Sequence, residues 1–274
     1  MIEQSFARTI QTIMKPLRPL LIFLSWIAPG ARVPAGEPVP KVIHVFVALC
    51  DNVSQGIQPV PAKIGNGDGL IDNLYWGCDD ALKPSLGRSG AWKKMMVGKP
   101  VGQEIILERV VFRHRASGAW LVADAYRGRE IKRALEDYFS ALAGILKSEV
   151  EVAGNKIQAG GQAGLAVYVG HNGLMEFNVE VQPPPAERGE ISAVAFYCVS
   201  RSYFADKIHT AGAKPLLLTT QLMYPGGFLV QRVAEAWIGG KSPLETLQSV
   251  AAGYAKNQGI SQKSAKGVFW VPGL

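Results

Sequence analysis

Two apolar segments of the sequence each end on a side chain that can take part in covalent catalysis. The segment LAVYV, residues 165–169, leads into Gly-His-Asn-Gly, which carries His171, and the segment ISAVAFY, residues 191–197, leads into Cys198. A cysteine thiolate is a strong nucleophile, and a neighbouring imidazole can take up and return its proton. Adjacent parallel strands would bring the two side chains together. The pattern therefore predicts a dyad of Cys198 as nucleophile and His171 as general acid and base.

Backbone groups near these residues suit the charge that such a reaction develops. Gly173 has no side chain, so a substrate can approach it closely, and its N–H together with that of Cys198 could bind a tetrahedral oxyanion. The segment SRSYFADKIHTAGA begins at Ser200 and is expected to form a helix that ends near Gly212. The positive end of that helix dipole would favour the thiolate form of Cys198.

The rest of the chain supplies the strands and helices that would hold this dyad. VIHVFVALCDN, residues 42–52, and KPLLLTT, residues 214–220, are short and mostly apolar, which is typical of strands buried on both faces of a parallel sheet. The Ala-Ser-Gly at 116–118 indicates a β-hairpin, and the helical spacing of apolar residues predicts a helix over 129–146. Further helices are expected over 73–87, 226–240 and 242–259. Buried strands that alternate with helices predict an α/β fold with a mostly parallel central sheet and small β-hairpin insertions.

A pocket for a substrate side chain is expected among the loops that follow the strands, because ligands bind at the carboxyl ends of such sheets. A basic substrate side chain would need a carboxylate. Asp51, Asp68 and Asp72 all lie in or next to the loop after the first strand, and Glu176 follows the strand at 165–169. Gln221 follows the strand at 214–220 and joins them as a pocket candidate. The sequence leaves open whether this pocket takes a basic, an acidic or an amide side chain.

The order of these features resembles the caspase-like cysteine peptidases, the group that includes caspases, legumains, gingipains and clostripain. The resemblance rests on a strand followed by the histidine and glycine, a next strand followed by the cysteine, and the helix–strand–helix segment 200–240. It covers roughly residues 42–240. It implies a caspase-like fold and a thiol protease that cleaves polypeptide substrates. It also implies that His171 is the general acid and base, Cys198 the nucleophile and Gly173 an oxyanion-hole donor.

Three positions depart from the pattern of that family. Asn172 stands where the family usually has a glycine directly after the histidine, and Phe196 and Tyr197 stand where the family usually has an acidic or small residue and an alanine. These positions bear on the geometry of the oxyanion hole. The alternative hypothesis is therefore a non-catalytic α/β binding or scaffold protein with the same fold.

Composition limits the other classes of function. The chain has 274 residues, of which 48% are hydrophobic, and this is enough for a sizeable core. Its net charge of +7 comes from scattered basic residues without a basic stripe among aromatics, so no nucleic-acid partner is expected. No Cys-x-x-Cys or His/Cys cluster occurs, so neither a metal nor a cofactor is expected. Residues 66–72, NGDGLID, match only the middle of a calcium loop, because Ile64 and Tyr75 occupy its two end positions.

The chain has three cysteines, which is too few for a disulfide framework. Cys50 also ends an apolar strand and competes with Cys198 as the reactive thiol. Asp51 argues against Cys50, since a neighbouring carboxylate raises the pKa of a thiol. In an oxidising compartment Cys50 and Cys78 could pair and leave Cys198 free.

The first 40 residues resemble a targeting leader. Arg8, Lys15 and Arg18 precede an uncharged apolar run at 20–28, and Val-Pro-Ala at 33–35 matches a small-residue cleavage site. The run is too short to span a bilayer as a helix. We predict a signal peptide or membrane-targeting leader plus linker over 1–40 and a caspase-like domain over 41–274. The protein would be exported (periplasmic or secreted) or membrane-associated, with membrane contact only through the leader; an ordinary amphipathic N-terminal helix is the alternative.

Overall fold

The central feature of the fold is a large mixed sheet. The computed structural model describes residues 41–273, and the expected leader and its cleavage site lie outside them. One sheet has the strand order β10-β9-β8-β7-β1-β4-β3-β2, and β5 and β6 form a separate ribbon. Strands β9, β8, β7, β1 and β4 are parallel, whereas β10, β3 and β2 each pair antiparallel with a neighbour. The expected α/β fold with a mostly parallel sheet and added hairpins is confirmed.

The elements follow one another along the chain in a fixed order. The strands are β1 (Val42–Ala48), β2 (Trp92–Gly98), β3 (Ile106–His114), β4 (Trp120–Tyr126), β5 (Lys147–Val152), β6 (Asn155–Gly160), β7 (Leu165–Val169), β8 (Ser192–Phe196), β9 (Lys214–Thr219) and β10 (Phe269–Trp270). The helices are α1 (Leu82–Arg88), α2 (Ile131–Leu142), α3 (Ser200–Thr210), α4 (Gly227–Ile238), α5 (Pro243–Gln258) and α6 (Gln262–Lys266), with short 3₁₀ turns η1 (Gly128–Glu130) and η2 (Gly173–Met175). No helix of the described residues is long and apolar enough to cross a membrane.

Strand β1 lies between β4 and β7 and is parallel to both. After β1 the chain first builds the β4 side of the sheet and then returns to β7 on the other side, so the strand order reverses beside β1. In open α/β sheets such a reversal leaves a crevice at the carboxyl ends of the strands, where ligands bind. The loops after β1 and β7 are therefore the expected borders of a site.

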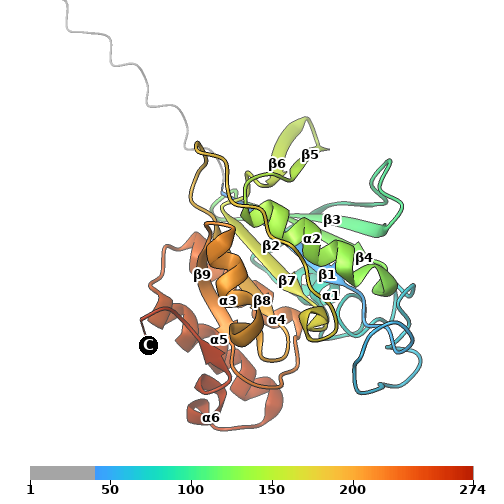
Figure 1. Ribbon diagram of the computed structural model, residues 1–274, viewed down its shortest axis with the longest axis vertical. Helices are drawn as coiled ribbons and strands as arrows, with labels where there is room; N and C mark the ends of the chain where they lie inside the picture. The colour runs from blue at the N-terminus through green and yellow to red at the C-terminus, as the bar shows by residue number, and fades with distance from the viewer. Residues whose placement is uncertain (1–40, 274) are drawn as a thin grey trace, which may run out of the picture. The chain divides into compact units, whose positions relative to one another are not determined.

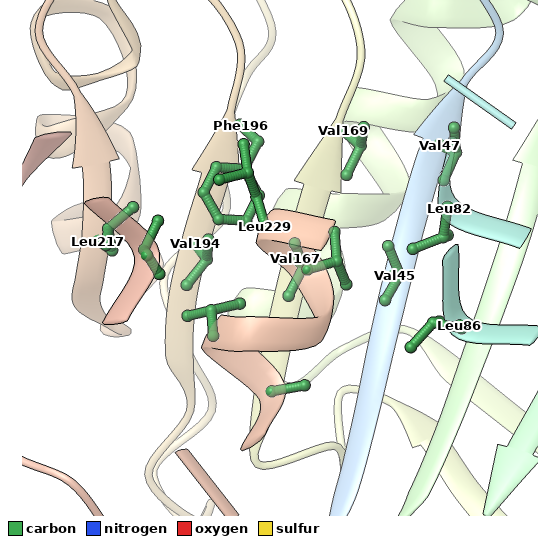
Figure 2. Packing of buried hydrophobic residues seen from close by; sticks show 14 of the residues in the cluster. Val45, Val47, Leu82, Leu86, Val167, Val169, Val194, Phe196, Leu217 and Leu229 are labelled. Carbon is green, nitrogen blue, oxygen red and sulfur yellow. The ribbon is translucent and has the colours of Figure 1, made fainter. Parts of the chain in front are cut away.

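Helices cover both faces of the sheet (Figure 1). Successive residues of a strand point to opposite faces, and in β1 this places Phe46 against Tyr138 of α2, and Val45 and Val47 in the layer that contains α1 and α4. Figure 2 shows the second of these layers, with Leu82 and Leu229 packed onto the valines of three neighbouring strands. Burial on both faces explains why the central strands are almost entirely apolar.

Several elements differ from the sequence expectation for identifiable reasons. The helix expected over 73–87 is shortened to α1, because the side chain of Asn73 bonds to the backbone of Cys50, Asn66 and Tyr75 and folds this stretch into turns. Pro84 lies in the first turn of α1, where its missing N–H has no helical partner to lose. Strands β2, β5 and β6 were not expected, since most of their side chains are polar or exposed.

Candidate functional site

His171 and Cys198 occupy equivalent positions at the carboxyl edge of the sheet. Val169 of β7 pairs in register with Phe196 of β8. His171 and Cys198 each follow their paired residue by two positions, and neighbouring strands lie about 4.8 Å apart. Both residues are only partly buried, and the His171 side chain retains 10% of its exposure. The fold thus brings the two predicted dyad residues to one accessible edge.

A buried asparagine joins the two loops that carry the dyad. The Nδ2 of Asn172 donates a 2.9 Å hydrogen bond to the backbone oxygen of Cys198, and the Asn172 side chain is fully buried. On the other side, the Tyr168 hydroxyl of β7 donates a 3.0 Å bond to the His171 backbone oxygen. One side-chain bond therefore holds the backbone of His171, and the other ties the residue after His171 to the backbone of Cys198.

The imidazole of His171 has a carboxylate partner that sequence reasoning had considered only as a pocket residue. His171 Nε2 lies 2.5 Å from Glu176 Oε1, and the same oxygen accepts a 2.8 Å bond from the Gly56 N–H. This second bond connects the loop after β7 to the loop after β1, across the point where the strand order reverses. In the neutral ring the pair fixes the Nε2–H tautomer and leaves Nδ1 free to accept a proton. The spacing of five residues gave no helical or strand pattern that could have identified the pair.

Cys198 is followed by a strained backbone position. Val199 has φ 58° and ψ 37°, a left-handed conformation that is costly for a β-branched residue, and its N–H donates to Gln221 O. The next residue, Ser200, is fully buried and clamped by Thr219 of β9, since each backbone N–H bonds the other's hydroxyl at 3.0 and 2.7 Å. Strain that is held in place in this way is often found at functional sites.

The oxyanion donors differ in their availability. Gly173 N–H donates to His171 O at 3.1 Å, so it is engaged within its own turn, and Gly173 is buried under the Phe177 ring. A Cβ at Gly173 would lie 2.5 Å from Phe177 Cζ, which explains the need for glycine here. Among the described residues, no acceptor bonds the N–H of Cys198. Of the two predicted donors, Cys198 is the free one.

Cys50 lies under the same edge but is fully buried. Burial raises the pKa of the Cys50 thiol to about 11, and the nearby Asp51 adds to the rise. Burial also raises the pKa of Tyr75, with further contributions from Cys50 and Cys198, so a neutral hydroxyl lies near both thiols. Cys50, Cys78 and Cys198 are all free thiols in this structure. A neutral, enclosed Cys50 is a poor nucleophile.

The predicted pocket residues lie in three different settings. Asp51 is nearly buried and accepts a 2.9 Å bond from the Val53 N–H. Asp68 is paired with Arg127 and Arg129, and Asp72 with Lys63 at 3.2 Å. Gln221 is exposed, and its backbone oxygen holds Val199 beside Cys198. Of these four residues, only Gln221 bonds the loop that carries Cys198. At Asp68 and Asp72 a cationic substrate group would have to displace the lysine and arginine side chains that already pair with these carboxylates.

No metal centre accompanies the dyad in the part of the chain that the structure describes. No group of three or more potential metal ligands occurs within residues 41–273, which includes the half-matching calcium loop. Five cavities of the described domain, of about 300 to 680 Å³, are lined by residues other than His171 and Cys198.

Comparisons of this chain with protein-family models, curated proteins and solved structures found no match. The functional argument therefore rests on the geometry of the site.

Proposed function

We propose that the protein is a cysteine endopeptidase with a caspase-like fold, in which Cys198 is the nucleophile and His171 the general acid and base. The observation that carries the proposal is the matched register of the two residues beyond the Val169–Phe196 pair. Three further observations support it: the Glu176 partner of His171, the strained and clamped backbone after Cys198, and the buried bond from Asn172.

The proposed reaction begins with transfer of the Cys198 thiol proton to His171. The sulfur attacks the peptide carbonyl carbon, and the oxyanion that forms is held by the Cys198 N–H. Collapse of this tetrahedral intermediate breaks the carbon–nitrogen bond of the peptide as His171 gives its proton to the leaving amine. Water, deprotonated by His171, then hydrolyses the thioester and restores the thiol. Glu176 would orient the ring and stabilise the imidazolium, which makes it a positioning residue.

The proposed substrate is a polypeptide that lies extended along the carboxyl edge. Gln221 is the best-placed pocket residue, because it adjoins Val199, and Asp51, Asp68 and Asp72 remain proposals for a basic side chain. No nucleic acid, metal or cofactor has a part in the proposed reaction. Export or membrane association through residues 1–40 is likewise proposed.

A non-catalytic binding protein is the second candidate. The engaged N–H of Gly173 favours it, since an oxyanion hole that includes Gly173 is not preformed. Binding would then use the same edge without bond cleavage.

Cleavage of a peptide library separates the two candidates. The full chain should cut a subset of peptides, Cys198→Ala should cut none, and Cys78→Ala, a matched change at another partly exposed thiol, should retain activity. Equal thermal stability of the two variants would show that both are folded. If Cys198→Ala cleaves as well as the parent chain, the proposed function is wrong.

A further inference from the structure

The edge of the sheet opposite the dyad is positively charged. Val42 of β1, Trp120 of β4, Arg113 of β3 and Lys93 of β2 lie at one level of the sheet, since each pairs in register with the next. Lys41 precedes Val42 and is the first described residue. The end of the sheet at which the chain enters the domain is therefore also the end that carries these cations.

Three exposed cations of this edge, Lys93, Arg113 and Arg115, lack anionic partners among the described residues. Lys93 and Arg113 are directly opposed across an antiparallel pair, an arrangement that is unfavourable for like charges. Within the described residues, none of Lys93, Arg113 and Arg115 forms an ion pair. Lys93, Arg113 and Arg115 are all exposed. The fold thus concentrates repelling charges here without neutralising them.

Two hollows open on this edge, and neither is lined by a carboxylate. One, of about 520 Å³, is lined by Lys93, Arg113 and Arg115 together with the β3–β4 turn. The other, of about 680 Å³, is lined by Lys41 and Lys156 together with Trp120. Arg113 lies over the Trp120 ring, 5.1 Å from its centre, and so links the two hollows.

The nearest carboxylates lie on the β5–β6 ribbon beside Lys156. Glu149 forms an ion pair with Lys156, and Glu151 pairs in register with the same lysine. Neither glutamate forms an ion pair with Lys93, Arg113 or Arg115, so the edge around Arg113 would attract a surface with fixed negative charge.

The sequence that precedes Lys41 indicates which kind of surface. The uncharged apolar run at 20–28 is joined to Lys41 by a linker of 12 residues, which reaches at most about 40 Å. Lys15 and Arg18 stand within the five residues before that run. A leader that partitions into a bilayer would hold the cationic edge within reach of lipid headgroups, and basic clusters beside such a segment bind anionic lipids.

We propose that the edge formed by Lys41, Lys93, Arg113, Arg115 and Lys156 docks on an anionic phospholipid surface. Cys50 follows Val42 by eight residues, so the edge that carries the dyad lies about 25 Å from the docking edge. The proposed catalytic residues then face away from the membrane. The inference does not depend on catalysis, because it uses none of the residues of the dyad.

Vesicle co-sedimentation of the full chain tests this docking. The probes are vesicles of phosphatidylcholine alone and of phosphatidylcholine mixed with phosphatidylglycerol, at low and high salt. The test variant is Lys93→Gln/Arg113→Gln/Arg115→Gln. The matched control, Lys256→Gln/Lys263→Gln/Lys266→Gln, removes the same charge from exposed positions of α5 and α6. These positions lie near the opposite, carboxyl end of the sheet, since the Thr220 hydroxyl after β9 donates a hydrogen bond to the oxygen of Gly267, the residue after α6.

We expect the parent chain and the control to bind the anionic vesicles alike, and the test variant to bind them more than tenfold more weakly. High salt should abolish this difference. Equal binding by all three proteins, or equal loss in both variants, would overturn the inference. Tighter binding to a DNA duplex than to anionic vesicles, lost in the same test variant, would also overturn it. The single variant Arg115→Gln, which should lose part of the binding, replaces the triple variant if the latter fails to fold.

Discussion

The side chain of Asn172 binds the backbone of Cys198. Its Nδ2 donates to the Cys198 oxygen over 2.9 Å, while the other amide atom, Oδ1, is buried without a partner among the described residues. Asn172 directly follows His171, so this one bond joins the loop of the proposed base to the loop of the proposed nucleophile. The asparagine that departs from the caspase-like pattern is thus the residue that connects the two halves of the site.

Replacing Asn172 should uncouple these loops. Asn172→Ala leaves the Cys198 oxygen without its side-chain donor, and we expect a loss of about 0.5–1.5 kcal/mol in the free energy of unfolding. Displacement of the dyad should lower the rate of Cys198 alkylation by about 10- to 100-fold. Urea unfolding and timed labelling measure the two effects. Asn178→Ala, at an exposed asparagine of the following segment, serves as the control, and equal effects of both changes would contradict the coupling.

Glu176 should act through His171 rather than on the substrate. Glu176→Gln keeps an acceptor for the Nε2–H but removes the negative charge, and we expect kcat/KM to fall about 10- to 100-fold while KM changes little. Glu180→Gln, at another exposed glutamate of this segment, should retain the kcat/KM of the parent chain. An unchanged kcat/KM in Glu176→Gln would show that the pair has no part in proton transfer.

Relief of the backbone strain at Val199 should increase the free energy of unfolding. Val199→Gly removes the steric cost of the left-handed conformation, and we expect the protein to become about 1 kcal/mol more stable while its activity falls. Ala153→Gly is the matched control, since Ala153 also has a positive φ of 49° but lies in the β5–β6 turn. That change should leave activity intact. A loss of stability in Val199→Gly would mean that the conformation is not strained.

The pair of Asp124 and Arg109 should dominate the acid stability of the domain. Burial alone would raise the pKa of Asp124, but hydrogen bonds from Arg109 and His44 outweigh it and hold the pKa below its ordinary value. Arg109→Met would leave the buried carboxylate of Asp124 with His44 as its remaining partner, and the loss of one partner of a buried pair typically costs about 3–5 kcal/mol. Lys99→Met, which breaks an exposed pair with Glu104, should have little effect.

This contribution has a defined pH window. Because the folded-state pKa of Asp124 is depressed, its stabilisation is complete above the unfolded pKa of about 3.9 and is lost as the pH falls through the lower folded value. The stability difference between the parent chain and Arg109→Met should therefore be largest near neutral pH and should shrink in acid. Urea unfolding across this range measures it, and a difference independent of pH would contradict the account.

The sequence predicted the parts of this fold that depend on apolar pattern. Burial on both faces marked the central strands, and the capping box at Ser242 marked the start of α5. Their register then brought His171 and Cys198 to one edge, as expected. The pattern did not reveal β2 or the β5–β6 ribbon, because lysines and glutamates occupy many of their positions.

The periodicity of apolar residues does not predict polar contacts between residues that are far apart in the sequence. Asn73 organises the loop after β1 through four hydrogen bonds, yet a single asparagine has no pattern in sequence. The roles of Glu176 and Asn172 likewise follow from tertiary contacts with Gly56 and Cys198. The pocket residues illustrate the same limit, since sequence does not show that Asp68 is already paired with arginines.

The central claim is that Cys198 is the activated thiol of this chain. The most direct measurement is to label the folded full chain at neutral pH with an irreversible thiol alkylating probe and to map the modified peptide. The account predicts modification of Cys198, faster than that of Cys78 and sensitive to Glu176→Gln, with Cys50 protected by burial and by a pKa of about 11. Preferential modification of Cys50 or Cys78, or a Cys198 no more reactive than an ordinary exposed thiol, would contradict it.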